Sequence, residues 1–225
     1  TMLSQTGGHA DSWEICGAHM PGMTDSHPGR PHPIVDGPEE MRKKVRELIR
    51  AGADVIKVAT SGGVLSPLSN PKHAHFRPDE LDALVSEATA ADRFVMAHAQ
   101  GTQGIKNAIS AGIRSIEHGI YLDDEAIEMM LAAGTYLVPT LMAPLGVLDQ
   151  IERGLELPEK VVRIATSVAE AHRDSVERAI AAGVKVAMGT DTGVTPHGEN
   201  LRELAEMAKL GMSDAQVLRS STTVS

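Results

Sequence analysis

Residues 104–119 read GIKNAISAGIRSIEHG, and this stretch decides the fold because a single glycine joins a helical pattern to a buried strand. Apolar residues spaced three and four apart predict a helix, and Gly112 supplies the left-handed stop that ends it. The run that follows, IRSIE, predicts a short strand. That strand ends in His118, so an imidazole stands where a buried segment leaves the sheet.

The same unit recurs four more times, with helical patterns leading into the strands DVIKVAT, RFVMAHA, TYLVPTL and VKVAMGTD. Three of these helical patterns end in Ala-Gly, at Gly52, Gly134 and Gly183, which predicts the same left-handed stop. Five helix-to-strand units in a row indicate an α/β fold with a parallel sheet, which is either an open doubly wound sheet or a (β/α)8 barrel. Polar residues end several different strands, which favours the TIM-type barrel, because an open sheet gathers its site at one crevice. The SGG at 61–63 lacks the spacing of a nucleotide-binding loop.

The barrel is expected to be incomplete. A full barrel takes about 250 residues, and the segments MLSQTGGHAD and RSSTTVS read as the tail of an earlier strand and an interrupted helix. We therefore expect residues 1–225 to form a single partial barrel domain, from the end of strand 3 through strand 8. The activity of this chain in isolation is expected to be lost with the front strands.

Composition excludes several classes of protein. A formal charge of −9 argues against nucleic acid or an anionic membrane as the partner. Cys16 is the single cysteine, so neither an intrachain disulfide nor a cysteine-based zinc site fits. No run approaches the roughly 18 apolar residues of a membrane span. We expect a cytoplasmic homo-oligomer.

Four strand residues carry the candidate chemistry: Lys57, His98, His118 and Asp191. Alternation along each strand puts each of them on a face with small or apolar neighbours, consistent with the barrel interior. A lysine in an apolar strand either snorkels from the strand end or is paired, because burying its charge is costly. Imidazoles and carboxylates are ligands for zinc and similar divalent ions. A desolvated lysine can also react with carbon dioxide to form a carbamate that bridges two metals.

The order and spacing of six motifs resemble one family: TGGHAD, AGADVIKVATSGGVLSP, VMAHAQGTQGI, SIEHGIYLDDEAI, YLVPTL and GVKVAMGTDTG. Together they resemble the metal-dependent amidohydrolase superfamily, in the prolidase-like and carboxypeptidase-like dipeptidase branch related to imidazolonepropionase. The resemblance implies one or two divalent ions, most simply zinc. It also implies that the small β-sandwich domain of the family is absent from this chain.

The resemblance further implies roles for five residues. Lys57 would be the carboxylated bridging ligand, His98 and His118 would hold one metal, and Asp191 would hold the other. Asp191 would also accept the proton of the attacking hydroxide, and His9 would polarise the scissile carbonyl.

The sequence departs from the family pattern in two places. The first-strand His-x-His pair is missing, and His73 and His75, which have that spacing, lie in a polar loop where we expect solvated side chains. Gln100 stands where prolidase-like relatives carry a tyrosine that meets the substrate carboxylate. Tyr121 and His197 are further candidates for substrate contacts, with packing and plain loop roles as their alternatives.

The implied activity is hydrolysis of an amide bond in a dipeptide-like or N-acyl amino acid substrate by a metal-bound hydroxide. Two alternatives stay open. Lys57 could act as a free amine in a Schiff-base aldolase, or the chain could be catalytically silent. The Pro/Gly/His-rich segment 19–38 is interpreted as an active-site flap or an ordered loop.

Overall fold

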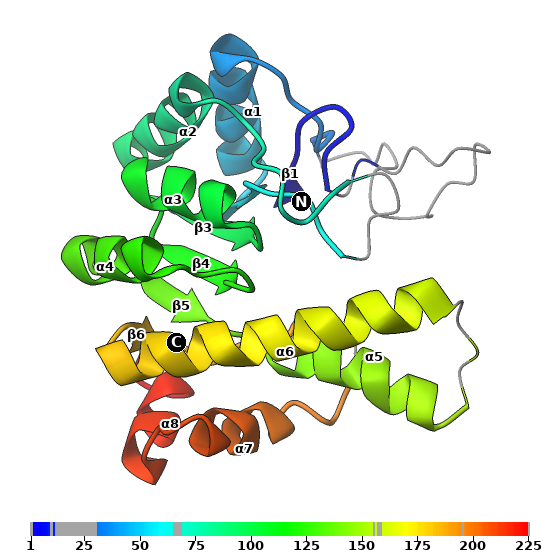
Figure 1. The fold of residues 1–225 in the computed structure, drawn as a ribbon. Coiled ribbons are helices and arrows are strands. Elements are labelled where there is room, and N and C mark those ends of the chain that lie inside the picture. Colours follow the sequence, from blue (N-terminus) through cyan, green and yellow to red (C-terminus); the bar gives the residue numbers. More distant parts are fainter. Residues whose placement is uncertain are drawn as a thin grey trace. The chain divides into compact units, whose positions relative to one another are not determined.

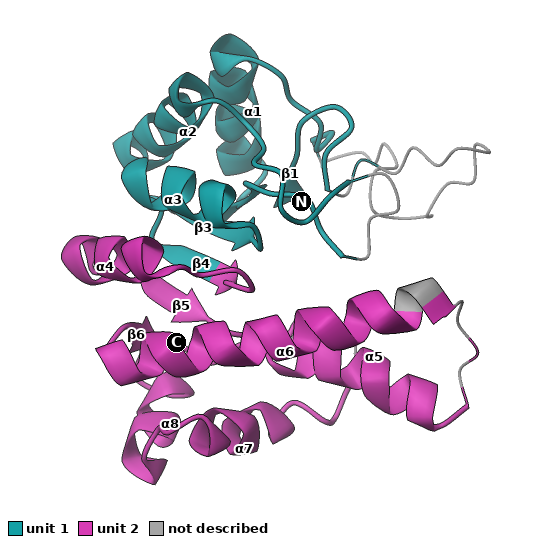
Figure 2. Cartoon of the chain, viewed as in Figure 1, with its two compact units in different colours: residues 1–116 teal, residues 117–225 magenta. Residues whose placement is uncertain are grey.

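The computed structural model describes residues 2–9, 11, 31–64, 69–154, 156, 159–194 and 196–224. The chain divides into two compact units, Thr1–Ile116 and Glu117–Ser225 (Figures 1 and 2). Most of the segment 19–38, interpreted above as a flap or loop, lies outside the described residues. No helix in the described ranges combines the length and the apolar character that crossing a membrane requires.

Unit 1 alternates strands and helices. Its elements are β1 (Met2–Leu3), α1 (Pro38–Arg50), β2 (Val55–Ala59), α2 (Pro78–Ala90), β3 (Phe94–Ala99) and α3 (Thr102–Ser110). The strands are parallel and lie in the order β1-β2-β3. The helices α1 and α2 pack side by side (Figure 1). The α/β class with a parallel sheet is thereby confirmed.

The strand register in unit 1 places Lys57 and His98 on one face of the sheet. Lys57 pairs with Met96, and Ala59, two residues further along β2, pairs with His98. Residues directly opposite one another point the same way, as do residues two apart. The other face of β2 carries the fully buried Ile56 and Val58. The polar residues therefore share the face of the strands that is less completely covered.

Unit 2 continues the alternation and adds helices that were not predicted. The boundary between the units runs through β4 (Ser115–His118). Unit 2 further contains α4 (Asp124–Ala133), β5 (Tyr136–Val138), α5 (Met142–Glu152), α6 (Glu159–Ala182), β6 (Lys185–Val186), α7 (Arg202–Lys209) and α8 (Asp214–Ser220). The strands β5 and β6 pair in parallel, and α5 packs against both α6 and α7.

The predicted glycine stops are confirmed. Gly52, Gly112, Gly134 and Gly183 follow helices α1, α3, α4 and α6, and all four have positive φ angles between 68° and 90°. The helix without a glycine, α2, is followed by Asp92 at φ 55°, and aspartate is among the residues that tolerate this conformation. The chain therefore turns into each following strand where the sequence predicted it.

Candidate active site

Unit 1 brings three of the predicted residues together. His9, which follows β1, stacks on His98 at the end of β3, with ring centroids 4.0 Å apart and planes inclined by 17°. Lys57 on β2 is close enough to His9 to lower the pKa of its imidazole. The lysine, the strand-end histidine and the loop histidine thus form one cluster within a single unit.

His98 is buried, and one of its ring nitrogens is engaged by the backbone. Its Nε2 lies 3.0 Å from the carbonyl oxygen of Gly62. A carbonyl can only accept, so Nε2 carries the proton and Nδ1 carries the lone pair. A second contact, from the Thr60 amide to the His98 carbonyl at 2.9 Å, holds the strand backbone next to the loop after β2. The Gly62 carbonyl therefore fixes the tautomer of the His98 ring.

His9 is a neutral imidazole at pH 7. Burial, the electrostatic effect of His75 and that of Lys57, in this order, lower its pKa from 6.5 to about 4. The ring lies against Gly63, where an added Cβ would come within 2.2 Å of His9 Nδ1. Glycine at position 63 lets the ring reach His98. A neutral imidazole there can donate one hydrogen bond, as polarising a carbonyl requires.

Gln100 connects the end of β3 to the loop after β2. Its backbone amide donates to Ser61 Oγ at 2.8 Å, and its side-chain Oε1 accepts from the Val64 amide at 3.1 Å. Gln100 is buried. The structure therefore gives it a loop-holding role, while its contact with a substrate stays a prediction.

His75 corrects one expectation. His73 is exposed, as predicted, but His75 is buried to 5% exposure, and burial followed by the effect of His73 lowers its pKa to about 4. The amide of His75 donates to the Thr60 carbonyl at 2.8 Å, and Ala74 forms an antiparallel bridge with Ser61. The expectation of two solvated loop histidines was wrong for His75, because these backbone contacts draw the loop inward. No local pattern in KHAHF marked this burial, since the neighbouring His75 and Phe76 are both buried whereas His73 is exposed.

In unit 2, His118 ends β4 with a left-handed backbone, at φ 76°. Its side chain is buried, and Nδ1 lies 2.7 Å from the hydroxyl of Thr140. Thr140 follows β5 and is also left-handed, at φ 52°, which is uncommon for a β-branched residue. Such conformations cost on the order of 1–3 kcal/mol each and persist where the surroundings enforce them, often at functional sites.

The backbone of His118 is held by a residue that the sequence did not single out. His172 on α6 lies with Nε2 2.8 Å from the His118 carbonyl oxygen, so this nitrogen carries the proton. His172 is 1% exposed, and burial lowers its pKa to about 4. Thr140, which follows the YLVP strand, was likewise missed. In the helical pattern around His172, a histidine that faces the protein is indistinguishable from one that faces solvent.

Asp191 lies further from its strand than predicted. The strand β6 is only two residues long, and Asp191 follows it by five residues, exposed and left-handed at φ 53°. Its carbonyl accepts from the Val194 amide at 3.2 Å. His197 is exposed in the same loop. Asp191 and His197 thus lie outside any strand, whereas the sequence predicted a strand running up to Asp191.

Tyr121 is partly buried just after β4, and burial raises the pKa of its hydroxyl. It lines an open pocket together with side chains of α6, which are Arg163, Ile164, Ser167 and Val168. This surrounding is compatible both with packing and with a substrate contact.

The four predicted metal ligands divide between the units, with Lys57 and His98 in unit 1 and His118 and Asp191 in unit 2. Among the described residues, no group of three His, Cys, Asp or Glu side chains is close enough to hold an ion. The chemistry of the donors nevertheless fits a metal. His98 and His118 each have one ring nitrogen in a hydrogen bond, the second contact that metal-binding histidines almost always make.

Glu203 is a buried carboxylate that the sequence did not indicate. It is on α7 with no exposed surface, and its two oxygens accept from the amides of Leu141 (2.8 Å) and Met142 (2.9 Å), where α5 begins. Burial raises the pKa of Glu203 from 4.5 to about 7, although both amide contacts oppose the rise. The carboxylate thereby fixes the backbone that directly follows Thr140.

This shift predicts a pH-dependent stability. Between pH 4.5 and 7 the folded chain holds the Glu203 proton more tightly than the unfolded chain does. The contribution of Glu203 to the free energy of unfolding therefore falls as the pH rises. The effect is on the order of 3 kcal/mol at most. Thermal unfolding should be measured at pH 5 and at pH 8. Raising the pH over this range should lower the midpoint temperature of the wild type by several degrees more than that of Glu203→Gln.

Glu128→Gln, an exposed change on α4, is the matched control for this series and should track the wild type at every pH. Parallel curves for the wild type and Glu203→Gln would contradict the prediction. The histidines with lowered pKa values act in the opposite direction, but they are common to all three proteins and cancel in the comparison.

A family model described as "Amidohydrolase family" matches residues 9–224. The ochratoxinase of Aspergillus niger is 39% identical over 230 residues, covering 98% of this chain and 47% of the relative. The chain thus spans about half the length of this curated relative.

Two solved structures have closely similar folds. A Xaa-Pro dipeptidase with methionine bound in its active site matches with a TM-score of 0.85 at 36% identity, covering 99% of this chain and 54% of the other. A prolidase complexed with N-methylphosphonate-L-proline matches with a TM-score of 0.86 at 36% identity, covering 100% and 54%. These matches confirm the barrel-type α/β fold, of which the described elements account for a part.

Proposed function

The chain belongs to the amidohydrolase family, and from this membership we propose that it forms part of a metal-dependent hydrolase of amide bonds. One observation carries the proposal. His98 and His118, at the ends of β3 and β4, each have one ring nitrogen in a hydrogen bond, to the Gly62 carbonyl and to the Thr140 hydroxyl. Such a hydrogen bond to one ring nitrogen is the contact that metal-binding histidines almost always make besides the metal.

The proposed ligands are His98, His118, Asp191 and a carboxylated Lys57, with zinc as the proposed ion. When bound, such an ion lowers the pKa of a water molecule and polarises the substrate carbonyl. Lys57 lies on the same sheet face as His98, which supports a shared role. As a carbamate, it would add two oxygens that share one negative charge to the ligand set.

Two of the residues have proposed proton or hydrogen-bond roles. Asp191 takes a proton from the attacking water and returns it to the leaving amine. His9, neutral at pH 7 and stacked on His98, donates a hydrogen bond to the scissile carbonyl oxygen as negative charge develops there.

The proposed substrate is a dipeptide or an N-acyl amino acid. The Xaa-Pro dipeptidase structure holds methionine, and the prolidase structure holds N-methylphosphonate-L-proline. Gln100 stands in place of the expected tyrosine, which supports specificity for substrates other than Xaa-Pro dipeptides. Tyr121 and His197 are proposed as further substrate contacts.

The test is a hydrolysis screen of dipeptides and N-acyl amino acids with the full-length protein, before and after dialysis against a chelator. We expect hydrolysis of at least one class, its loss on chelation and its return on addition of Zn²⁺. Hydrolysis that survives complete removal of metal would contradict the proposal, as would a screen with no hydrolysed amide in a zinc-loaded sample.

A further inference from the structure

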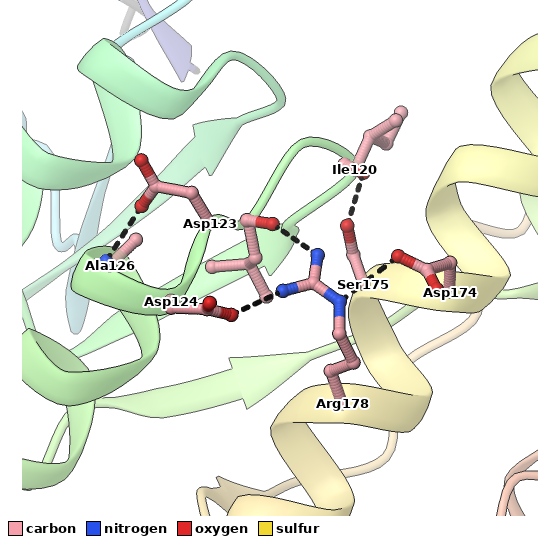
Figure 3. A network of polar contacts seen from close by, with 8 residues as sticks. Ile120, Asp123, Asp124, Ala126, Asp174, Ser175 and Arg178 are labelled. Atoms are coloured by element: carbon pink, nitrogen blue, oxygen red, sulfur yellow. Dashed lines mark hydrogen bonds and ion pairs between the residues drawn. The ribbon is translucent and has the colours of Figure 1, made fainter.

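The segment that carries His118 is held by one face of α6. Alternate carbonyls of this segment, at residues 118, 120 and 122, accept hydrogen bonds from His172 (2.8 Å), Ser175 (2.7 Å) and Arg178 (2.7 Å). The three donors are spaced three residues apart, so they lie along one side of the helix. Figure 3 shows two of these contacts, from Ser175 to Ile120 and from Arg178 to the segment before α4.

Arg178 anchors the start of α4, whereas Ser175 contacts the Ile120 carbonyl, two residues after His118. Arg178 also pairs with Asp124 in the first turn of α4 and with Asp174 on its own helix (Figure 3). Asp123 caps the same helix by accepting from the Ala126 amide at 2.8 Å. His172 is the donor that contacts the His118 backbone itself.

The ring of His118 is held from another element. Thr140 Oγ1 lies 2.7 Å from His118 Nδ1, and Glu203 clamps the two amides that follow Thr140. A hydroxyl can accept from Nδ1–H, and in that arrangement Nε2 carries the lone pair. The backbone and the ring of His118 therefore have separate supports. Both His118 and Thr140 have left-handed backbone conformations, which persist only where the surroundings enforce them.

We propose that Thr140 and His172 are positioning residues for His118, with Thr140 selecting the ring tautomer that carries the proton on Nδ1 and the lone pair on Nε2, and His172 holding the left-handed backbone. The inference rests on the proposed function in one respect, that His118 is a metal ligand. Its first measurement, however, needs neither metal nor substrate.

That measurement is the tautomer of His118 by nitrogen NMR of full-length protein labelled with ¹⁵N-histidine, at a pH where an ordinary imidazole is neutral. The His118→Gln variant assigns the signal. We expect the Nδ1–H form in the wild type, loss of this preference in Thr140→Val and its recovery in Thr140→Ser, which restores the hydroxyl. An unchanged tautomer in Thr140→Val, with the protein still folded, would overturn the role of Thr140.

The role of His172 is tested by zinc affinity, measured in competition with a chromophoric chelator. His172→Leu removes the donor, whereas His172→Gln keeps an N–H. We expect His172→Leu to weaken zinc binding by about 10–100-fold, the usual effect of losing a contact behind a ligand, and His172→Gln to recover most of it. Equal loss in both variants would overturn the role of His172.

Ser175→Ala is the matched control, because it removes a hydrogen bond of similar length to the same segment, two residues further on. Its zinc affinity should remain near that of the wild type. An equal loss in Ser175→Ala would mean that general loosening of the segment is responsible, and it would overturn the specific role of His172. If the tautomer changes as expected but no amide is hydrolysed, the proposed function fails and the inference on Thr140 stands.

Discussion

Lys57→Ala is expected to lower kcat/KM for amide hydrolysis by about three orders of magnitude, because metal assistance contributes several kcal/mol and each 1.36 kcal/mol is a factor of ten. Lys57 lies mid-strand on β2, in register with Met96 and on the sheet face of His98. As a carbamate, formed when Nζ bonds to carbon dioxide and loses a proton, it would join the ligand set. Alanine supplies no such oxygens, so zinc content should fall together with activity.

A short carboxylic acid added to Lys57→Ala should restore part of the activity, because its two oxygens can replace those of the carbamate. Lys185→Ala is the matched control: Lys185 also lies on a strand, β6, but is exposed beside Tyr136, and its loss should leave hydrolysis unchanged. Borohydride trapping of a carbonyl compound on Lys57 would support the Schiff-base aldolase and count against the hydrolase.

Asp191→Asn is expected to lower kcat by about 10²–10⁴, the usual contribution of a positioned acid or base. Asparagine preserves the size of the side chain but cannot take up the proton of the attacking water. Loss of an interaction that forms only in the transition state lowers kcat and kcat/KM together and leaves KM little changed. Zinc content measured on the same samples separates loss of a ligand from loss of proton transfer.

The matched control for this change is Asp92→Asn. Asp92 is exposed with φ 55°, nearly the backbone conformation of Asp191 at φ 53°, so the two variants share any cost of the conformation itself. Asp92→Asn should retain full activity. A folded Asp191→Asn enzyme with kcat within tenfold of the wild type would rule out the proton-transfer role.

Local patterns in the sequence were enough to predict the order of helices and strands in most of the chain. Helical periodicity, strand runs and glycine stops act over a few residues, so Gly112 and Gly134 could be predicted to be left-handed stops before any partner was known. The same patterns predicted that Lys57, His98 and His118 lie on or at the ends of strands. The short β6 and the missed α5 show the limit, since no periodic signal distinguished them.

The candidate site was only partly predictable. The family resemblance implied a site role for His9, but its stacking on His98 was seen only in the structure, and no local pattern indicated that His75 is buried. Its burial results from an antiparallel bridge between Ser61 and Ala74, which depends on where two loops meet. A polar loop that bends inward has the same composition as one that stays in solvent.

By itself, the sequence determined the α/β alternation, the helix ends and the strand positions of Lys57, His98 and His118, because periodicity and backbone preference are properties of neighbouring residues. The tertiary structure alone decided what supports His118: Thr140 lies 22 residues away along the chain and His172 lies 54 residues away. Glu203, 62 residues from Leu141, likewise became a buried cap of α5 only through folding. Hydrogen bonds between distant side chains depend on which elements pack together, and a threonine, histidine or glutamate has the same local signature whether it meets such a partner or water.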